Sequence, residues 1–195
     1  MARKGRLIAL AAAGGAALVL ILLAVPIYEL AVETWLLWRL DSANSVERLE
    51  AARRLGERGS LRALDPLLSL AAVQSRDAGR TIGDAIDAIV ARRGPDAAWH
   101  LGELIRAQEE PAAYLAACRL GSMGPAAMPA IAAALDDRST SVRWLGLHAL
   151  LGLGPQGEAA ARRTTELLDD PDIAIREHAR SALAGMKADL KTNRR

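Results

Sequence analysis

The side chains that most often carry out chemistry are few in this chain and do not form a catalytic or metal-binding pattern. The three histidines, His100, His148 and His178, have no cysteine or second histidine at the spacing of metal ligands. His148 and His178 stand among alanines, and the single cysteine, Cys118, lies in an alanine-rich segment. We therefore interpret these side chains as packing or surface residues, with Cys118 as a small buried hydrophobe.

Neither the acidic pairs nor a comparison with known catalytic motifs indicates a catalytic site. Asp84 with Asp87 and Glu109 with Glu110 fit solvated helix faces and helix caps. The chain has no Gly-rich phosphate loop, no nucleophile elbow and no His-Glu-x-x-His motif. We therefore predict that the protein is not an enzyme, has no catalytic residues, and holds no metal ion or cofactor.

The composition of the 195 residues predicts an all-α protein. The apolar residues make up 51% of the chain and are mainly Ala and Leu, with no Phe, two Tyr and four Trp. Ala and Leu favour helix, whereas the β-branched and aromatic residues that favour strands are scarce. A single cysteine excludes an intramolecular disulfide and leaves the redox compartment open.

The basic isoelectric point of about 9.0 comes from the two ends of the chain. Residues 1–6 and 187–195 each carry a net charge of +3, and together they hold seven of the 25 bases and one of the 23 acids. The remaining 18 bases and 22 acids give residues 7–186 a net charge of −4. Since a domain that binds duplex nucleic acid carries a basic surface on the fold itself, we expect no nucleic-acid partner.

An apolar run near the N-terminus predicts a membrane-spanning helix. Residues 7–28 are twenty-two consecutive uncharged residues. A helix of that length reaches roughly 33 Å, enough for a hydrocarbon core of about 30 Å. The alternative is a cleaved signal peptide, which has an apolar region of about 7–15 residues and small residues at its cleavage site. The run is longer than that and ends with Pro26 and bulky residues, so we prefer an uncleaved anchor.

The charges on either side of the run predict its orientation. Arg3, Lys4 and Arg6 precede it, and Glu29 and Glu33 follow it. The positive-inside rule then places the N-terminus in the cytoplasm and the following domain outside it. The predicted localisation is a single-pass protein of the inner or plasma membrane. Just after the run, Tyr28, Trp35 and Trp38 suit either an aromatic belt at the membrane surface or an entry helix that caps the following domain.

Three Gly-Pro pairs recur at intervals of thirty residues, as Gly94-Pro95, Gly124-Pro125 and Gly154-Pro155. Gly after a helix can take the left-handed conformation that satisfies the last carbonyls, and Pro is favoured at the first position of the next helix. Each pair therefore predicts the tight turn of a helical hairpin. A fixed period of this length indicates a stacked repeat array.

A second recurring phrase has the form Asp-x4-Val/Ile-Arg. It occurs as Asp137 with Val142 and Arg143, and as Asp170 with Ile175 and Arg176. With the alanine-rich helices that follow, the phrase resembles HEAT repeats, in particular the short bacterial kind grouped with phycobilisome-lyase HEAT-like repeats. The resemblance covers roughly residues 41–186 and is closest over 111–186, with a lapse across 76–116.

The resemblance implies a short right-handed α-solenoid of about four to five helical hairpins, here preceded by one transmembrane helix. It also implies that Asp137, Arg143, Asp170 and Arg176 form a structural ladder between neighbouring repeats. We expect five segments: 1–6 as a basic cytoplasmic N-terminus, 7–28 as a transmembrane helix, 29–44 as an interfacial or entry helix and linker, 45–186 as a HEAT-like repeat domain, and 187–195 as a basic tail.

In HEAT-like stacks the second helix of each hairpin lines the concave face. The residues that this places there include Trp99, His100, Arg106, Arg162 and Arg163, and Trp and Arg are enriched in binding hot spots. We expect these five residues to contact a partner; the alternative is that they are ordinary solvated helix faces.

These observations favour a non-enzymatic, membrane-anchored HEAT-repeat adaptor or scaffold that binds a protein partner. An accessory subunit of a larger membrane complex is a related possibility. The resemblance also leaves open a bilin lyase or chaperone role, or that of a DNA-alkylation glycosylase, although the acidic folded region argues against DNA.

Overall fold

The computed structural model describes residues 24–74, 76–107, 110–153 and 158–192, and these form helices and short turns with no strand. The elements are a first helix over residues 24–39, then α2 (Ser45–Arg58), η1 (Leu61–Ala63), α3 (Leu64–Val73), α4 (Arg76–Arg93), α5 (Pro95–Ala107), α6 (Glu110–Ser122), η2 (Gly124–Ala127), α7 (Met128–Leu135), α8 (Thr140–Gly152), α9 (Glu158–Glu166), η3 (Leu167–Asp169) and α10 (Ile173–Thr192). The predicted all-α class is confirmed.

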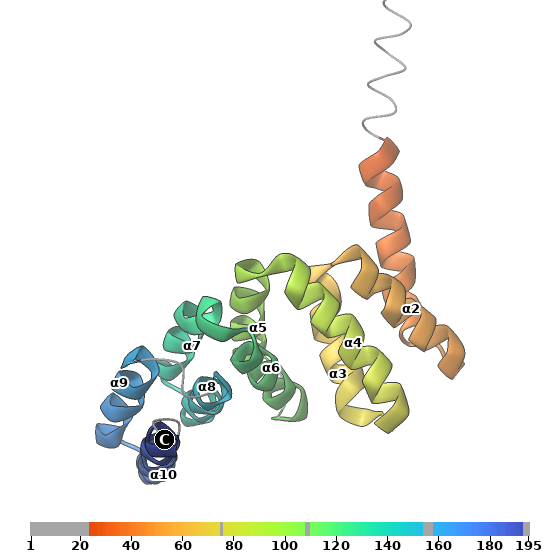
Figure 1. The fold of residues 1–195 in the computed structure, drawn as a ribbon. Helices are drawn as coiled ribbons and strands as arrows, with labels where there is room; N and C mark the ends of the chain where they lie inside the picture. The colour runs from red at the N-terminus through yellow and green to blue at the C-terminus, as the bar shows by residue number, and fades with distance from the viewer. Residues whose placement is uncertain (1–23, 75, 108–109, 154–157, 193–195) are drawn as a thin grey trace, which may run out of the picture.

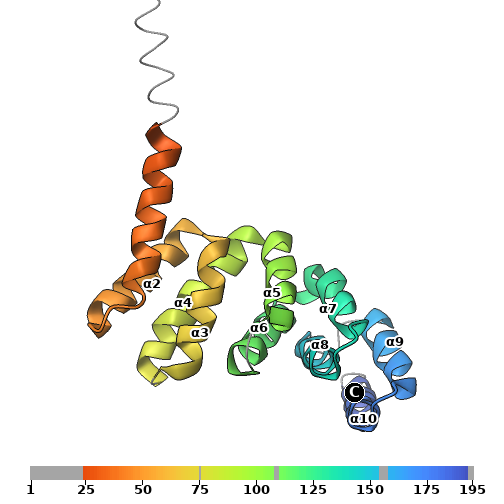
Figure 2. The ribbon, with the colours of Figure 1, turned by 180° about the vertical axis from the view of Figure 1, so that it is seen from behind.

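The helices follow one another as a curved stack (Figures 1 and 2). In the C-terminal half, α6, α8 and α10 lie on the inner side of the bend, whereas α5, α7 and α9 lie on the outer side (Figure 1). The predicted array of helical repeats is therefore confirmed. The resemblance placed the second helix of each hairpin on the concave face; in this half of the stack the first helices occupy it.

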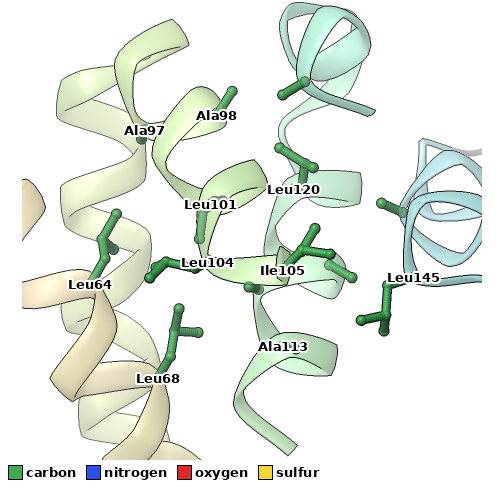
Figure 3. Packing of buried hydrophobic residues seen from close by; sticks show 14 of the residues in the cluster. Leu64, Leu68, Ala97, Ala98, Leu101, Leu104, Ile105, Ala113, Leu120 and Leu145 are labelled. Atoms are coloured by element: carbon green, nitrogen blue, oxygen red, sulfur yellow. The ribbon is translucent and has the colours of Figure 1, made fainter. Parts of the chain in front are cut away.

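A single apolar core runs through the stack. It extends from Leu36 in the first helix to Ala179 in α10 and consists almost entirely of Leu, Ile, Val and Ala. Figure 3 shows a central part, where Leu64 of α3, Leu104 of α5 and their neighbours fill the space between successive helices. Because each helical pair contacts the next through this core, no pair could bury its apolar face alone.

The Gly-Pro pairs lie at helix ends, as their chemistry requires. Gly94 and Gly124 have φ angles of +50° and +71°, in the left-handed region that favours glycine. The Gly94 N–H donates to the carbonyl of Val90 at 2.9 Å, and Pro95 begins α5. Gly154-Pro155 lies outside the described residues.

The predicted single-pass membrane localisation is wrong: in the part of the chain that the structure describes, no helix is both long and apolar enough to cross a membrane. Residues 7–23 of the expected span lie outside that part. The described remainder belongs to the first helix, which carries Glu29 and Glu33. Near its end, Leu36 is buried in the repeat core, and so is Leu40 in the turn that follows.

A buried arginine connects consecutive repeats. The Nε and Nη2 atoms of Arg143 donate to the two carboxylate oxygens of Asp170 at 2.9 and 3.0 Å. Its Nη1 atom donates to the carbonyls of Asp137 and Arg138 at 3.2 and 3.1 Å. Arg176 repeats the second half of this pattern, donating to the carbonyls of Asp170 and Pro171. The guanidinium of Arg143 thus joins α8, the turn before it and the turn before α10.

The ion pairs shift the pKa values of the groups they join. Burial acts to raise the pKa of Asp170, but hydrogen bonds from Arg143 and the Asp172 N–H outweigh it and leave the pKa below its usual value. The pKa of Asp137 is also lowered, first by the Ser139 N–H and then by Arg106. Nε of Arg106 donates to Oδ2 of Asp137 at 2.9 Å, so an arginine of α5 also holds the α7–α8 turn.

Helices α6 and α8 approach closely at Gly121 and Gly152. A Cβ atom added to Gly121 would lie 2.6 Å from the carbonyl oxygen of Ala149 and 3.0 Å from Cα of Gly152. Both obstacles are backbone atoms, which cannot rotate away. Glycine at position 121 therefore sets the separation of α6 from α8.

We predict that Gly121→Ala lowers the free energy of unfolding by about 1–3 kcal/mol, because the added methyl group forces two helix backbones apart. The matched control is Gly79→Ala in α4, where an added Cβ meets nothing within 4 Å. That change should raise stability by about 0.5–1 kcal/mol, because alanine restricts the unfolded chain and favours helix. Urea denaturation measures both; a Gly121→Ala protein as stable as the parent would contradict the close approach.

We predict that Asp170→Ala costs roughly 3 kcal/mol, because it leaves the buried Arg143 guanidinium without its carboxylate. The control is Glu177→Ala, which removes the exposed pair with Arg180 and should change stability little. Equal denaturation midpoints for the two variants would show that the buried pair does not stabilise the stack.

Candidate functional site

The inner side of the bend carries a groove between α6 and α8. Five residues line it, Pro111 and Tyr114 from α6 and Ser141, Trp144 and Leu145 from α8, around a volume of about 380 Å³. The side walls are Tyr114 and Trp144, which remain 40% and 36% exposed, while Leu145 is buried and forms the floor. We call these five residues the aromatic groove.

The groove is built from equivalent positions of two successive repeats. Pro111 and Ser141 are thirty residues apart, and so are Tyr114 and Trp144. Within each helix the two residues are three apart, which places them on one helix face. One repeat further on, Arg176 takes the position of Arg143, so Glu177 takes the position of Trp144 and the aromatic wall ends at α8.

The two aromatic walls are supported by a row of rings. The Tyr114 and Trp144 centroids are 6.4 Å apart. His148 packs on both, 4.6 Å from Tyr114 and 5.7 Å from Trp144, with its plane within 9° of the indole. His178 of α10 contacts Trp144 at 6.1 Å. Since each ring is held by others, the groove is largely formed before any ligand arrives.

Cys118 and the two histidines lie beside these walls, again thirty residues apart along the chain. The Cys118 sulfur is 3.6 Å from Nε2 of His148. The negative charge of a Cys118 thiolate, together with burial, raises the pKa of Tyr114. Burial, and next the charge of His178, lowers the pKa of His148. Within the described residues, no group of three or more His, Cys, Asp or Glu side chains could hold a metal ion.

The groove is uncharged but not without polar groups. None of its five lining residues is acidic or basic. Among the described residues, the Trp144 indole N–H and the Ser141 hydroxyl have no hydrogen-bond partner. Both are on α8 at positions three apart. The site therefore combines apolar walls with two available donors on one side.

The residues that the sequence suggested for partner binding do not gather in one place. Trp99 and His100 lie on α5, with Trp99 50% exposed, whereas Arg162 and Arg163 lie on α9, and α7 stands between the two helices (Figure 1). Two of the five form ion pairs with the α7–α8 turn: Arg106 with Asp137, and Arg163 with Asp136 at 2.7 Å. Their role in binding a partner stays a prediction.

The aromatic groove was missed in the sequence although a signal was present. The thirty-residue period that aligns the Gly-Pro pairs also aligns Tyr114 with Trp144, and Cys118 with His148 and His178. Applying the period to aromatic residues would have placed them on neighbouring helices. It would not have shown that they face the inner side.

Comparisons with known proteins give a fold-level likeness and no family. No family model matches the chain, and no curated protein matches it. Among solved structures, an engineered protein is 21% identical over 80% of this chain and 79% of its own, with a TM-score of 0.40. A designed armadillo repeat protein is 15% identical (78% and 98%, TM-score 0.30). Another, solved in complex with the peptide (KR)4, is 17% identical (79% and 87%, TM-score 0.37). We draw no functional conclusion from these scores.

We predict that acidification weakens the fold in two separate pH windows. As the pH falls through about 6.5, the unfolded chain takes up a proton at His148 that the folded protein resists, so stability decreases. Asp137 and Asp170 act only at lower pH, since their lowered pKa values contribute stability that is lost near and below pH 4. Urea midpoints measured at pH 8 and pH 5 should differ less for His148→Gln than for the parent; equal differences would contradict this assignment.

Proposed function

We propose that the chain is a HEAT-type repeat adaptor without enzymatic activity that binds a protein partner in the aromatic groove. The observation that carries the proposal is the exposed pair of Tyr114 and Trp144, held by ring contacts on α6 and α8, the helices on the inner side of the bend. Hot spots of protein interfaces are enriched in Trp and Tyr and lie in well-packed pockets. The absence of charge at the centre of the groove also fits the core of an interface.

The HEAT type is part of this proposal. Its support is the ladder of Arg143 with Asp170 and of Arg176 with the turn before it, which joins consecutive repeats in the way that the resemblance implies. Arg143 belongs to the buried ladder. The next residue, Trp144, lines the groove and takes no part in the ladder.

The surface around Trp99 on α5 is a second candidate, because Trp99 is more exposed than Trp144. Among the described residues, Trp99 has no ring contact, whereas Trp144 has three. Trp99 and Trp144 therefore offer a matched pair of exposed tryptophans for an experiment that separates the two surfaces.

We predict that peptides selected on the full-length chain from a random displayed library bind through Trp144. Trp144→Ala should weaken the selected peptides at least tenfold, whereas Trp99→Ala should leave the dissociation constant within about twofold. Fluorescence polarisation with labelled peptides measures the constants, and circular dichroism checks that both variants fold.

The opposite pattern, with loss of binding in Trp99→Ala alone, would move the site to α5. A library that yields no peptide dependent on Trp144 would overturn the groove as the binding site.

A further inference from the structure

We propose that the segment taken by the aromatic groove is proline-rich and binds in the polyproline II conformation. This inference rests on the proposed function and specifies the class of partner. It is argued from the shape of the walls, the available hydrogen-bond donors and the lack of charge.

The walls of the groove suit pyrrolidine rings. The half-exposed rings of Tyr114 and Trp144 line the groove together with the buried Leu145, and Pro111 lies one turn before Tyr114 on α6. Flat aromatic faces and a prolyl ring pack over much of their area, and aromatic-lined grooves are the usual binding sites for polyproline II segments. Such a segment is already ordered before binding, so little conformational entropy is lost on association.

The polar groups of the groove match the polar groups of the same ligand. A tryptophan N–H can only donate, and a serine hydroxyl can donate as well. A polyproline II segment makes no internal hydrogen bonds, and its prolines have no N–H, so the segment offers mainly carbonyl acceptors. Trp144 and Ser141, which have no partners within the described part of the chain, would donate to those carbonyls.

The uncharged lining of the groove argues against a ligand with a charged group at its centre. No acid or base lines the groove. Arg143, the cation next to Trp144 in the chain, is already paired with Asp170. A phosphorylated or strongly charged segment would therefore lose its hydration without gaining a counter-charge.

The length of the groove favours an extended segment over a helix. A helical ligand binds through residues spaced over two turns, at i, i+3 or i+4 and i+7. The aromatic wall covers α6 and α8 and does not continue onto α10, where Glu177 takes the position of Trp144. Polyproline II rises about 3.1 Å per residue, and the ring centroids of Tyr114 and Trp144 are 6.4 Å apart. A few prolyl residues would therefore span the groove.

Isothermal titration of the full-length chain with a decaproline peptide tests the proposal. We expect decaproline to bind at least tenfold more tightly than a Gly-Ser decapeptide, which has no prolyl rings. Trp144→Ala should weaken decaproline at least tenfold and Ser141→Ala by about two- to fivefold, while Trp99→Ala should have no effect. Equal affinity for the two peptides, tighter binding of an amphipathic helical peptide, or decaproline binding that survives Trp144→Ala would each overturn it.

The library selection described above separates this inference from the function on which it rests. Selected peptides that need Trp144 but lack proline would retain the adaptor function and overturn the polyproline assignment. If neither the library nor decaproline gives binding that depends on Trp144, both proposals fail.

Discussion

The buried ion pair of Arg143 and Asp170 is the interaction on which the C-terminal half of the stack depends. Removing two charges from water is costly, and the cost is offset here because the carboxylate receives two hydrogen bonds from the guanidinium and the guanidinium reaches two further carbonyls. Those carbonyls belong to the turn that starts α8, and the carboxylate belongs to the turn that precedes α10. The pair therefore fixes how one repeat sits on the next.

The geometry of the aromatic groove depends on this ion pair. Trp144 follows Arg143 in the chain, so an α8 held by the ladder also holds the indole against His148 and His178. On the other side, the contact of Gly121 with Gly152 sets the distance between α6 and α8, and hence the distance between the tyrosine and tryptophan walls. The proposed recognition surface requires no strained backbone of its own, because the packing that stabilises the repeats also positions its side chains.

Much of the fold could be predicted because it depends on local chemistry. The Gly94-Pro95 and Gly124-Pro125 pairs specify where helices stop and start, and the Asp170 phrase anticipates the partner of Arg143. The direction of the bend was not predictable, since it results from the summed packing of many alanines and leucines. For the same reason the sequence could not show that Arg106 and Arg163 would turn toward the acids of the α7–α8 turn. The apolar run predicted a membrane span. In the described helix that continues it, however, Leu36 and the following Leu40 are buried in the core of the repeats.

The glutamate at position 177, which stands where the next repeat would carry its equivalent of Trp144, has a consequence for how such a protein can change. The groove residues recur with the repeats, so an aromatic residue added at this position would extend the proposed binding surface by one helix. Ligand length is therefore governed by a few surface side chains that the core does not use. New specificities can arise by single substitutions on the inner face, while the fold and its stability stay nearly constant.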